Sequence, residues 1–286
     1  MILIIGATGQ TGGAIAKELI AGGQKVRAAV RNPARAEGLR QIGVDVVQAD
    51  AAQVDGLKPA LDSIDKVLIA TGSEEGLVET QTKIIRAVKG SVKSVAKISA
   101  LGATTDSPVR LLRVHGIADA ELQNSGVPFT LIQPVFFMQN FLQSAGTIAA
   151  QNVIISPIGN GKEALIDVRD VGRFGAKVLS EDGHENQRYL ISSRDSLTGA
   201  EIAEKLSLAV GRKLQFISPD PEEYKRTLLS FGVPEWTAAG LIELYAMVAR
   251  GEGDVITDTF QKLTGKDPIS FDEFARDHAQ VFLQTQ

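Results

Sequence analysis

The sequence of 286 residues contains no cysteine. Disulfides, thiolate nucleophiles and cysteine-ligated metals are therefore excluded, and the composition suits a reducing compartment. Histidine is also scarce, and its three copies, His115, His184 and His278, lie far apart in the chain. Their separation offers no spacing typical of a metal site, so we expect no bound metal.

Long apolar runs and a surplus of basic charge are absent as well. No apolar stretch reaches the roughly 18 residues that a transmembrane helix requires, so we expect no membrane partner. The formal net charge is −4 and basic residues do not cluster, which argues against a nucleic-acid partner. Because Met1 opens an apolar strand with no basic segment before it, we expect no signal peptide and a cytoplasmic location.

What is present is a regular alternation of apolar strands and amphipathic helices in the first half. The expected strands are residues 1–5, 25–30, 44–48, 66–70, 94–99 and 129–132. A first helix is expected directly after the first glycines, and further helices are expected at 54–61, 76–88 and 108–124. Strands that are apolar throughout are typical of a parallel sheet covered on both faces. The alternation predicts an α/β fold with a Rossmann-type doubly wound parallel sheet.

After about residue 135 the alternation loosens. The pattern there predicts strands at 154–158 and 188–193 and helices at 170–179, 197–210, 221–231, 234–249 and 271–283. Asp170 and Ser196 are expected to cap the first two of these helices. We therefore expect a dinucleotide-binding Rossmann core in residues 1–150. A smaller mixed α/β substrate lobe is expected in residues 151–286, with a sheet contribution back to the core.

A glycine-rich turn joins the first strand to the first helix. The apolar run Met1–Ile5 stops at GATGQTGG, and a helical pattern follows. Gly6 permits a tight exit from the strand, Gly9 lets the backbone approach phosphates, and Gly12 lets helix and strand pack closely. The helix N-terminus adds free N–H groups and the positive end of its dipole. This order of elements predicts a seat for a dinucleotide pyrophosphate.

The end of the second strand indicates which dinucleotide binds. NAD-selective sites usually place a carboxylate there to hold the ribose 2′-hydroxyl, whereas this chain has Arg31, Asn32 and Arg35. A guanidinium binds a 2′-phosphate that a carboxylate would repel. We therefore expect NADP(H) to be preferred over NAD(H), with Arg31 as the main ligand and Arg35 or Asn32 assisting. The alternative is that both arginines are solvated loop charges.

Several motifs together resemble the NmrA-like group of atypical short-chain dehydrogenases over nearly the whole chain. They are GATGQTGG, VRNPAR, Asp50 after the third strand, SGVPFTLIQPVFFMQNF (125–141), DVRDVG (167–172) and TGKDPISFDEFARDH (264–278). The resemblance is closest to the bacterial NAD(P)H-dependent quinone oxidoreductases and triphenylmethane-dye reductases of that group. It implies strand order 3-2-1-4-5-6-7, a small C-terminal lobe and bound NADP(H). The group also includes redox sensors without evident chemistry.

One departure from the wider short-chain dehydrogenases concerns their Tyr-x-x-x-Lys pair. Counted back from the sixth strand, its two positions fall on Leu111 and His115. The chain's tyrosines are all elsewhere, at Tyr189, Tyr224 and Tyr245. We expect His115 to replace the lysine by bonding the nicotinamide ribose, with Asp119 orienting it from one turn away. The alternative is that His115 is a partly exposed helix residue.

The remaining cofactor contacts are expected from position. They are Thr8, Gln10 and Thr11 at the phosphates, Asp50 and Ala51 near the adenine, Thr71 and Gly72 at the ribose, and Ser99, Ala100 and Pro134 towards the nicotinamide. Ser99 is also a weak catalytic candidate, because its hydroxyl is a possible donor to a substrate oxygen. For Asp50 and Ser99 the alternative is ordinary turn chemistry at a strand end.

Without the tyrosine, the chemistry that survives is hydride transfer to an acceptor that is already electrophilic. Such a site needs a flat apolar pocket more than an acid. Phe137 and Met138 are expected to line it, and Trp236 with Phe231 and Tyr245 is expected to close it. Plain core packing is the alternative for the Phe-Phe-Met segment.

The sequence therefore predicts an NADPH-dependent oxidoreductase that passes hydride directly to a quinone-like or dye-like aromatic acceptor. The alternative is an NADP(H)-binding redox sensor with little or no catalysis. Chemistry on a nucleotide sugar or an isoflavonoid-like ether is a third option, and the missing Tyr-x-x-x-Lys pair argues against the sugar version. We expect a small aromatic substrate and a monomer or homodimer.

Overall fold

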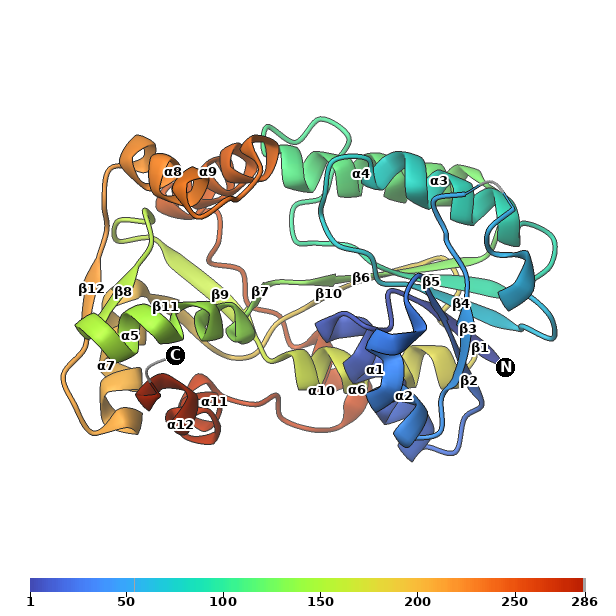
Figure 1. The fold of residues 1–286 in the computed structure, drawn as a ribbon, viewed down its shortest axis with the longest axis horizontal. Helices are drawn as coiled ribbons and strands as arrows, with labels where there is room; N and C mark the ends of the chain where they lie inside the picture. Colours follow the sequence, from blue (N-terminus) through green and yellow to red (C-terminus); the bar gives the residue numbers. More distant parts are fainter. Residues whose placement is uncertain (54, 285–286) are drawn as a thin grey trace. The chain divides into compact units, whose positions relative to one another are not determined.

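The computed structural model describes residues 1–53 and 55–284 (Figure 1). Its main sheet has seven strands in the order β10-β6-β5-β4-β1-β2-β3. The strands are β1 (Ile2–Ile5), β2 (Val26–Val30), β3 (Asp45–Gln48), β4 (Lys66–Ile69), β5 (Ser94–Ile98), β6 (Phe129–Pro134) and β10 (Gln187–Ile191). The pairs from β3 through β6 are parallel. The Rossmann-type fold and the strand order 3-2-1-4-5-6 followed by a seventh strand are thus confirmed.

Helices cover both faces of this sheet, as Figure 1 shows. They are α1 (Gln10–Ala21), α2 (Glu37–Gln41), α3 (Leu77–Val88), α4 (Arg110–Asn124) and α6 (Val168–Ser180), with the 3-10 turns η1 (Pro33–Ala36) and η2 (Lys58–Ala60). Helices α1 and α6 pack closely because α6 carries glycine at the contact. A Cβ placed on Gly175 would lie 2.6 Å from the Ile15 side chain.

The apolar composition of the strands explains why the sheet forms the centre. All four residues of β1 are buried, whereas the edge strand β3 has exposed residues at both ends. One core cluster joins Leu3 and Ile5 to Val67, Ile84 and Leu131. Burying a side chain of this size contributes roughly 1.5–3 kcal/mol, so the sheet and its helices stabilise each other.

The chain forms two compact units, and neither is a single continuous segment. The first unit comprises residues 1–107, 112–134 and 168–190, and the second comprises 108–111, 135–167 and 191 onward. The expected division near residue 150 places α6 and β10 in the C-terminal lobe, whereas nearly all their residues belong to the first unit.

The second unit contains two small sheets, one with order β11-β9-β7 and one with order β12-β8. Its strands are β7 (Phe136–Phe137), β8 (Val153–Ile155), β9 (Lys162–Ile166), β11 (Ser196–Thr198) and β12 (Gln215–Ile217). Its helical segments are η3 (Met138–Ser144), α5 (Ala145–Gln151), α7 (Gly199–Val210), α8 (Pro221–Ser230), α9 (Glu235–Ala249), α10 (Thr259–Thr264), α11 (Phe271–Asp277) and α12 (Ala279–Leu283). Most of the elements that the sequence pattern did not predict are too short to show the hydrophobic periodicity of a helix or a strand.

Three expected helix features are wrong. In the region 54–61 only the 3-10 turn Lys58–Ala60 forms, and Val54 lies outside the described residues. Asp170 does not cap α6, because the helix already begins at Val168 and Asp170 sits in its first turn. The expected helix 271–283 is broken at His278, whose backbone leaves the helical conformation.

The cap of α7 also differs from expectation. Ser196 lies in strand β11, two residues before the cap, and Thr198 takes that role. The Thr198 hydroxyl accepts from the Glu201 N–H, and the Glu201 carboxylate accepts from the Thr198 N–H in return. This reciprocal pair satisfies two backbone groups at once, which favours the later start.

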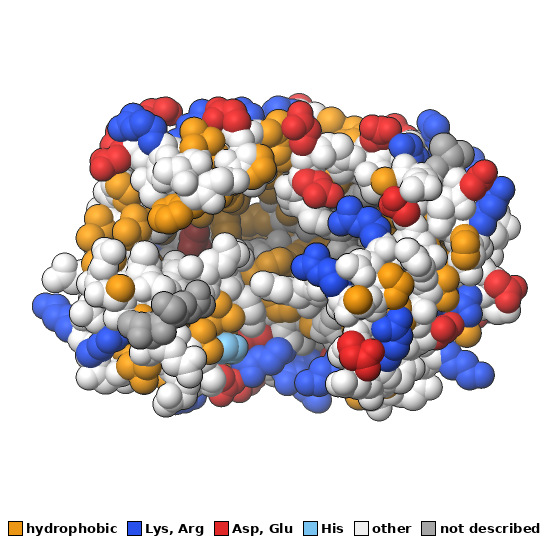
Figure 2. All heavy atoms as spheres, in the orientation of Figure 1, with side chains coloured by type: hydrophobic (Ala, Val, Ile, Leu, Met, Phe, Trp, Pro, Cys, Tyr) orange, Lys and Arg blue, Asp and Glu red, His pale blue; other side chains and the backbone are white. Residues whose placement is uncertain are grey.

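Among the described residues, no helix combines the length and apolar character needed to cross a membrane. On the face drawn in Figure 2, acidic and basic side chains are interspersed.

Candidate functional site

A pocket of about 300 Å³ lies at the carboxyl ends of strands β1 to β4, within the first unit. The sequence-predicted residues that line it are Gly6, Thr8, Gly9, Arg31, Asp50, Ala51, Thr71 and Gly72. Side chains that the sequence did not suggest also contribute, among them Glu74 and Thr80. The pocket therefore gathers four strand-end loops that are far apart in the chain.

The glycine turn is the tightest part of this pocket. Gly6 has a φ of +92°, in the left-handed region that disfavours a side chain. A Cβ on Gly6 would lie 2.2 Å from the Ala70 carbonyl oxygen, and one on Gly12 would lie 2.4 Å from the Gly6 oxygen. Strand β4, the turn and α1 can approach this closely only because both positions lack a side chain.

Helix α1 begins at this turn with its first N–H groups uncapped. Its N-cap is Gly9, and no described side chain accepts a hydrogen bond from the cap region. The first turn also contains no acidic residue. The N–H groups of Gln10, Thr11 and Gly12 have no acceptor within the helix, so they suit the oxygens of an anion.

Two guanidinium groups follow β2 at the edge of the pocket. Arg31 lines the pocket, while Arg35 lies outside its lining in η1, and both residues are exposed. Neither guanidinium forms an ion pair with a residue that the structure describes, whereas the nearby Arg27 pairs with Asp45 at 2.7 Å. Asn32 already uses its side-chain oxygen to accept from the Ala34 N–H at 3.0 Å.

Asp50 and Thr71 are held by local hydrogen bonds. The Asp50 carboxylate accepts from the Ala52 N–H at 3.0 Å, which is the turn chemistry named as its alternative. The Thr71 hydroxyl oxygen accepts from the Gln81 side-chain amide at 2.8 Å. The other Gln81 side-chain atom, its carbonyl oxygen, is buried without a described partner.

Beside the pocket, five polar side chains form one hydrogen-bonded chain. The Ser73 hydroxyl lies 2.7 Å from Nε2 of His115, and Nδ1 of His115 lies 3.3 Å from the Lys97 ammonium. Lys97 then donates to Asp119 at 2.7 Å, and Asp119 accepts from the Ser99 hydroxyl at 2.6 Å. Lys97 is completely buried, and only Ser73 is exposed.

This arrangement corrects two expectations and adds one observation about His115. His115 is 4% exposed, so it is not a partly exposed helix residue. Asp119 does not orient His115 directly, because its carboxylate bonds Lys97 and Ser99 instead. Burial, and secondly the charge of Lys97, lowers the pKa of His115 to about 3, so the ring is neutral at physiological pH.

Lys97 is the functional candidate that the sequence analysis missed. It stands in the middle of the buried strand β5, where a lysine is seldom tolerated without a partner. A lysine inside an apolar run was thus an available signal, but its partners on α4 were not identifiable from spacing. Burial lowers the pKa of Lys97, and the adjacent Asp119 carboxylate opposes that effect.

The other predicted residues lie outside the pocket lining. Ala100 is half-buried, and the carbonyl of the buried Pro134 accepts from the Leu101 N–H at 3.2 Å. Phe137 and Trp236 are half-buried in the second unit. Met138 is completely buried there, in a core cluster with Leu165 and Phe271, so pocket lining is the wrong role for it. Phe231 is 81% exposed.

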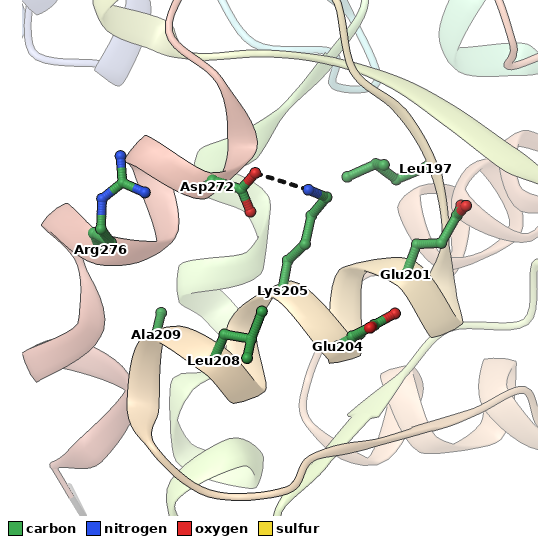
Figure 3. Close-up of a pocket in the computed structure, with 8 residues that line it drawn as sticks. All are labelled: Leu197, Glu201, Glu204, Lys205, Leu208, Ala209, Asp272 and Arg276. Atoms are coloured by element: carbon green, nitrogen blue, oxygen red, sulfur yellow. Dashed lines mark hydrogen bonds and ion pairs between the residues drawn. The ribbon is translucent and has the colours of Figure 1, made fainter.

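A second hollow, of about 560 Å³, lies between α7 and α11 in the second unit (Figure 3). Its lining includes the carboxylates of Glu201, Glu204 and Asp272 and the cations of Lys205 and Arg276. Lys205 reaches across to Asp272 at 2.8 Å, as the dashed line shows. This is the one ion pair drawn among the lining residues, and the lining carries both acidic and basic groups.

Known proteins match this chain over almost its full length. A model of the NmrA-like family matches residues 1–275. The chain is 35% identical to the NAD(P)H azoreductase of Xenophilus azovorans over 99% of both chains. It is 32% identical to quinone oxidoreductase 2 of Escherichia coli strain K12, over 93% of this chain and 94% of the relative.

Solved structures give the same result. The NADPH-dependent quinone oxidoreductase QOR2 of Escherichia coli, complexed with NADPH, has a TM-score of 0.88 and 30% identity, covering 97% of this chain and 99% of the other. The triphenylmethane reductase of Citrobacter sp., complexed with NADP(H), has a TM-score of 0.85 and 27% identity, covering 98% of this chain and 100% of the other.

Proposed function

The chain belongs to the NmrA-like family, and from this premise we propose that it is an NADPH-dependent oxidoreductase that reduces quinone-like or dye-like aromatic acceptors. The observation that carries the proposal is the pocket at β1 to β4, where a turn with glycine at positions 6 and 9 lies beside the Arg31 guanidinium, which has no ion pair with a described residue. The relatives named above as azoreductase, quinone oxidoreductase and triphenylmethane reductase support the acceptor class.

The residues present fit a dinucleotide with an additional phosphate. A Cβ at Gly6 or Gly12 would collide with backbone, so glycine at these positions lets strand, turn and helix pack closely. The uncapped N–H groups of α1 at this turn are then suited to a pyrophosphate. Arg31 at the end of β2 is free to bind a 2′-phosphate. Asp50 and Ala51 bound the pocket where the adenine would lie. When bound, NADPH supplies the hydride.

The protein's own contribution to the chemistry is positioning rather than acid catalysis. Leu111 stands at the position where the sequence comparison expects the tyrosine, and its hydrocarbon side chain has no proton to donate. His115 stays neutral and its ring nitrogens are both engaged. Acceptors whose reduced form delocalises its charge, such as quinones and cationic dyes, need no strong acid from the protein. This property makes them the proposed substrates.

Removing the Arg31 guanidinium tests the cofactor assignment. We expect Arg31→Ala to weaken NADPH binding by about 1.5–3 kcal/mol, the range for a hydrogen bond to a charged group, and to leave NADH binding nearly unchanged. Titration calorimetry with both cofactors measures the two effects. Arg40→Ala is the matched control, because Arg40 is exposed and bonds the Pro33 carbonyl at 2.9 Å outside the pocket lining. Equal losses for NADPH and NADH would reject the assignment.

Turnover tests the proposed reaction. When menadione, benzoquinone, malachite green or an azo dye is supplied, we expect the protein to oxidise NADPH well above the uncatalysed background. The absorbance of the reduced cofactor measures this oxidation. NADPH that binds tightly but is not oxidised with any of these acceptors would favour the alternative function, a nucleotide-binding redox sensor. Absence of NADPH binding would contradict both.

A further inference from the structure

The chain of polar side chains beside the pocket has its two ends in loops at the carboxyl ends of strands. Ser73 follows β4 and Ser99 follows β5, and in open parallel sheets ligands bind outside these carboxyl ends. Lys97 lies at the centre, 2.7 Å from Asp119 and 3.3 Å from His115. Its position on β5 points its side chain at two residues of α4 that are one turn apart.

With Lys97 as an ammonium ion paired with the Asp119 carboxylate, donor and acceptor rules give the direction of each hydrogen bond in this chain. An ammonium has donors only, so Nδ1 of His115 must be the acceptor towards Lys97. A neutral ring then carries its proton on Nε2, which donates to the Ser73 oxygen at 2.7 Å. The Ser73 hydroxyl proton is thereby left free for another partner.

The same rules give Ser99, at the other end of the chain, the opposite role. The Asp119 carboxylate is an acceptor only, so the Ser99 hydroxyl must donate to it, at 2.6 Å. A serine has one proton, and this bond uses it. Ser99 therefore keeps only lone pairs for a ligand, which makes it an acceptor and not the proton donor that the sequence suggested.

We infer that Lys97 is a positioning residue: it fixes the His115 tautomer that makes Ser73 a donor, and it pairs with the Asp119 carboxylate that makes Ser99 an acceptor. The inference rests on the proposed function for its ligand, the nicotinamide half of the cofactor with its amide and hydroxyl groups. It also deepens that function. Ser99 and His115 have no proton to give, and Ser73, the remaining donor of the five side chains, is a weakly acidic hydroxyl. The protein therefore favours acceptors that take their proton from solvent.

Energetics agree with a positioning role. Burying an ion pair costs several kcal/mol in desolvation, and apolar replacements are often equally stable, so such pairs contribute little to stability. The charged and titratable groups acting on Lys97 are Asp119 and His115 from α4 and the cation of Arg188 from β10. Of these groups, the Asp119 carboxylate is the one whose negative charge compensates the charge of Lys97.

Nitrogen-15 NMR of the histidine rings tests the inference on the intact protein. In the wild type, we expect His115 to show the Nε2–H tautomer alone and no titration between pH 5 and 8. His115→Gln identifies the signal by removing it. In Lys97→Met, Asp119 is left as an unpaired negative charge beside the ring, so we expect the His115 titration midpoint to rise by about 1 to 3 pH units.

A wild-type ring protonated at Nδ1, or a titration that Lys97→Met leaves unchanged, would overturn the inference. Should Lys97→Met fail to fold, the double variant Lys97→Met/Asp119→Asn tests the inference in its place. It removes both members of the buried ion pair, so no unpaired charge is left to destabilise the fold. We expect that double variant to show both His115 tautomers. A single Nε2–H tautomer there would also overturn the inference, since no ammonium then faces Nδ1.

A kinetic measurement separates this inference from the proposed function. With NADPH and menadione, we expect the wild-type kcat to be flat from pH 5 to 8. The kcat of Lys97→Met should change towards pH 5, as His115 begins to titrate. A wild type without any reductase activity would contradict the proposed reaction, while the NMR result would still decide the role of Lys97.

Discussion

Gly6→Ala is expected to lower the free energy of unfolding by about 2–5 kcal/mol. A non-glycine residue in the left-handed region costs about 1–2 kcal/mol, and forcing a methyl group into a packed site costs about 1–3 kcal/mol more. Both costs apply, because Gly6 has a φ of +92° and its added Cβ would lie 2.2 Å from the Ala70 carbonyl oxygen. Backbone, unlike a side-chain end, cannot rotate away.

Urea denaturation of the purified variant measures this loss. The matched control is Gly38→Ala in α2, where the added Cβ meets nothing within 4 Å and φ is ordinary. There alanine is expected to stabilise by roughly 0.5–1 kcal/mol, as in the interior of other helices. Gly6→Ala with unchanged stability would mean that the turn is looser than the structure shows. Any Gly6→Ala protein that folds should bind NADPH more weakly.

Glu163→Gln is expected to make the protein more stable than the wild type above neutral pH. Glu163 lies in β9 with 7% of its surface exposed, and burial raises its pKa from 4.5 to about 7. A carboxyl group whose pKa is raised by folding contributes stability that is complete below about pH 4.5. That contribution is lost as the pH rises through 7. The loss amounts to about 3 kcal/mol, at roughly 1.4 kcal/mol per pH unit.

Unfolding free energies of wild type and Glu163→Gln between pH 4.5 and 8.5 test this expectation. The variant should gain about 3 kcal/mol relative to the wild type across that range, because glutamine has no charge to bury. Glu204→Gln serves as the control, since Glu204 is an exposed residue of α7 and should show no comparable trend. A constant difference between wild type and Glu163→Gln would place Glu163 in contact with water.

The sequence analysis identified the features of the site that depend on residues close together in the chain. The spacing of Gly6, Gly9 and Gly12 between a strand and a helix reports backbone requirements within one turn, and all three positions form that turn in the structure. Arg31 follows β2 directly, so its place beside the turn follows from parallel pairing of β1 and β2. Both arguments need only neighbouring elements.

Side-chain partnerships across elements were not predictable in the same way. The spacing of His115 and Asp119 suggested a direct contact, but Lys97 from β5 enters between them. Gln81 of α3 likewise reaches Thr71 after β4. Such partners depend on the register of a helix over a strand, and apolar periodicity does not encode that register.

Taken alone, the sequence determined the fold class, the glycine turn and the guanidinium groups after β2, while the order of the main strands came from the family resemblance. The first three depend on hydrophobic pattern, glycine backbone freedom or strand-end position, which are properties of short segments. Only the tertiary structure decided that His115 is neutral, that Ser99 is committed as a donor to Asp119 and that Met138 is core. Burial sets these properties, because desolvation and the nearest charge act through space between residues that are distant along the chain.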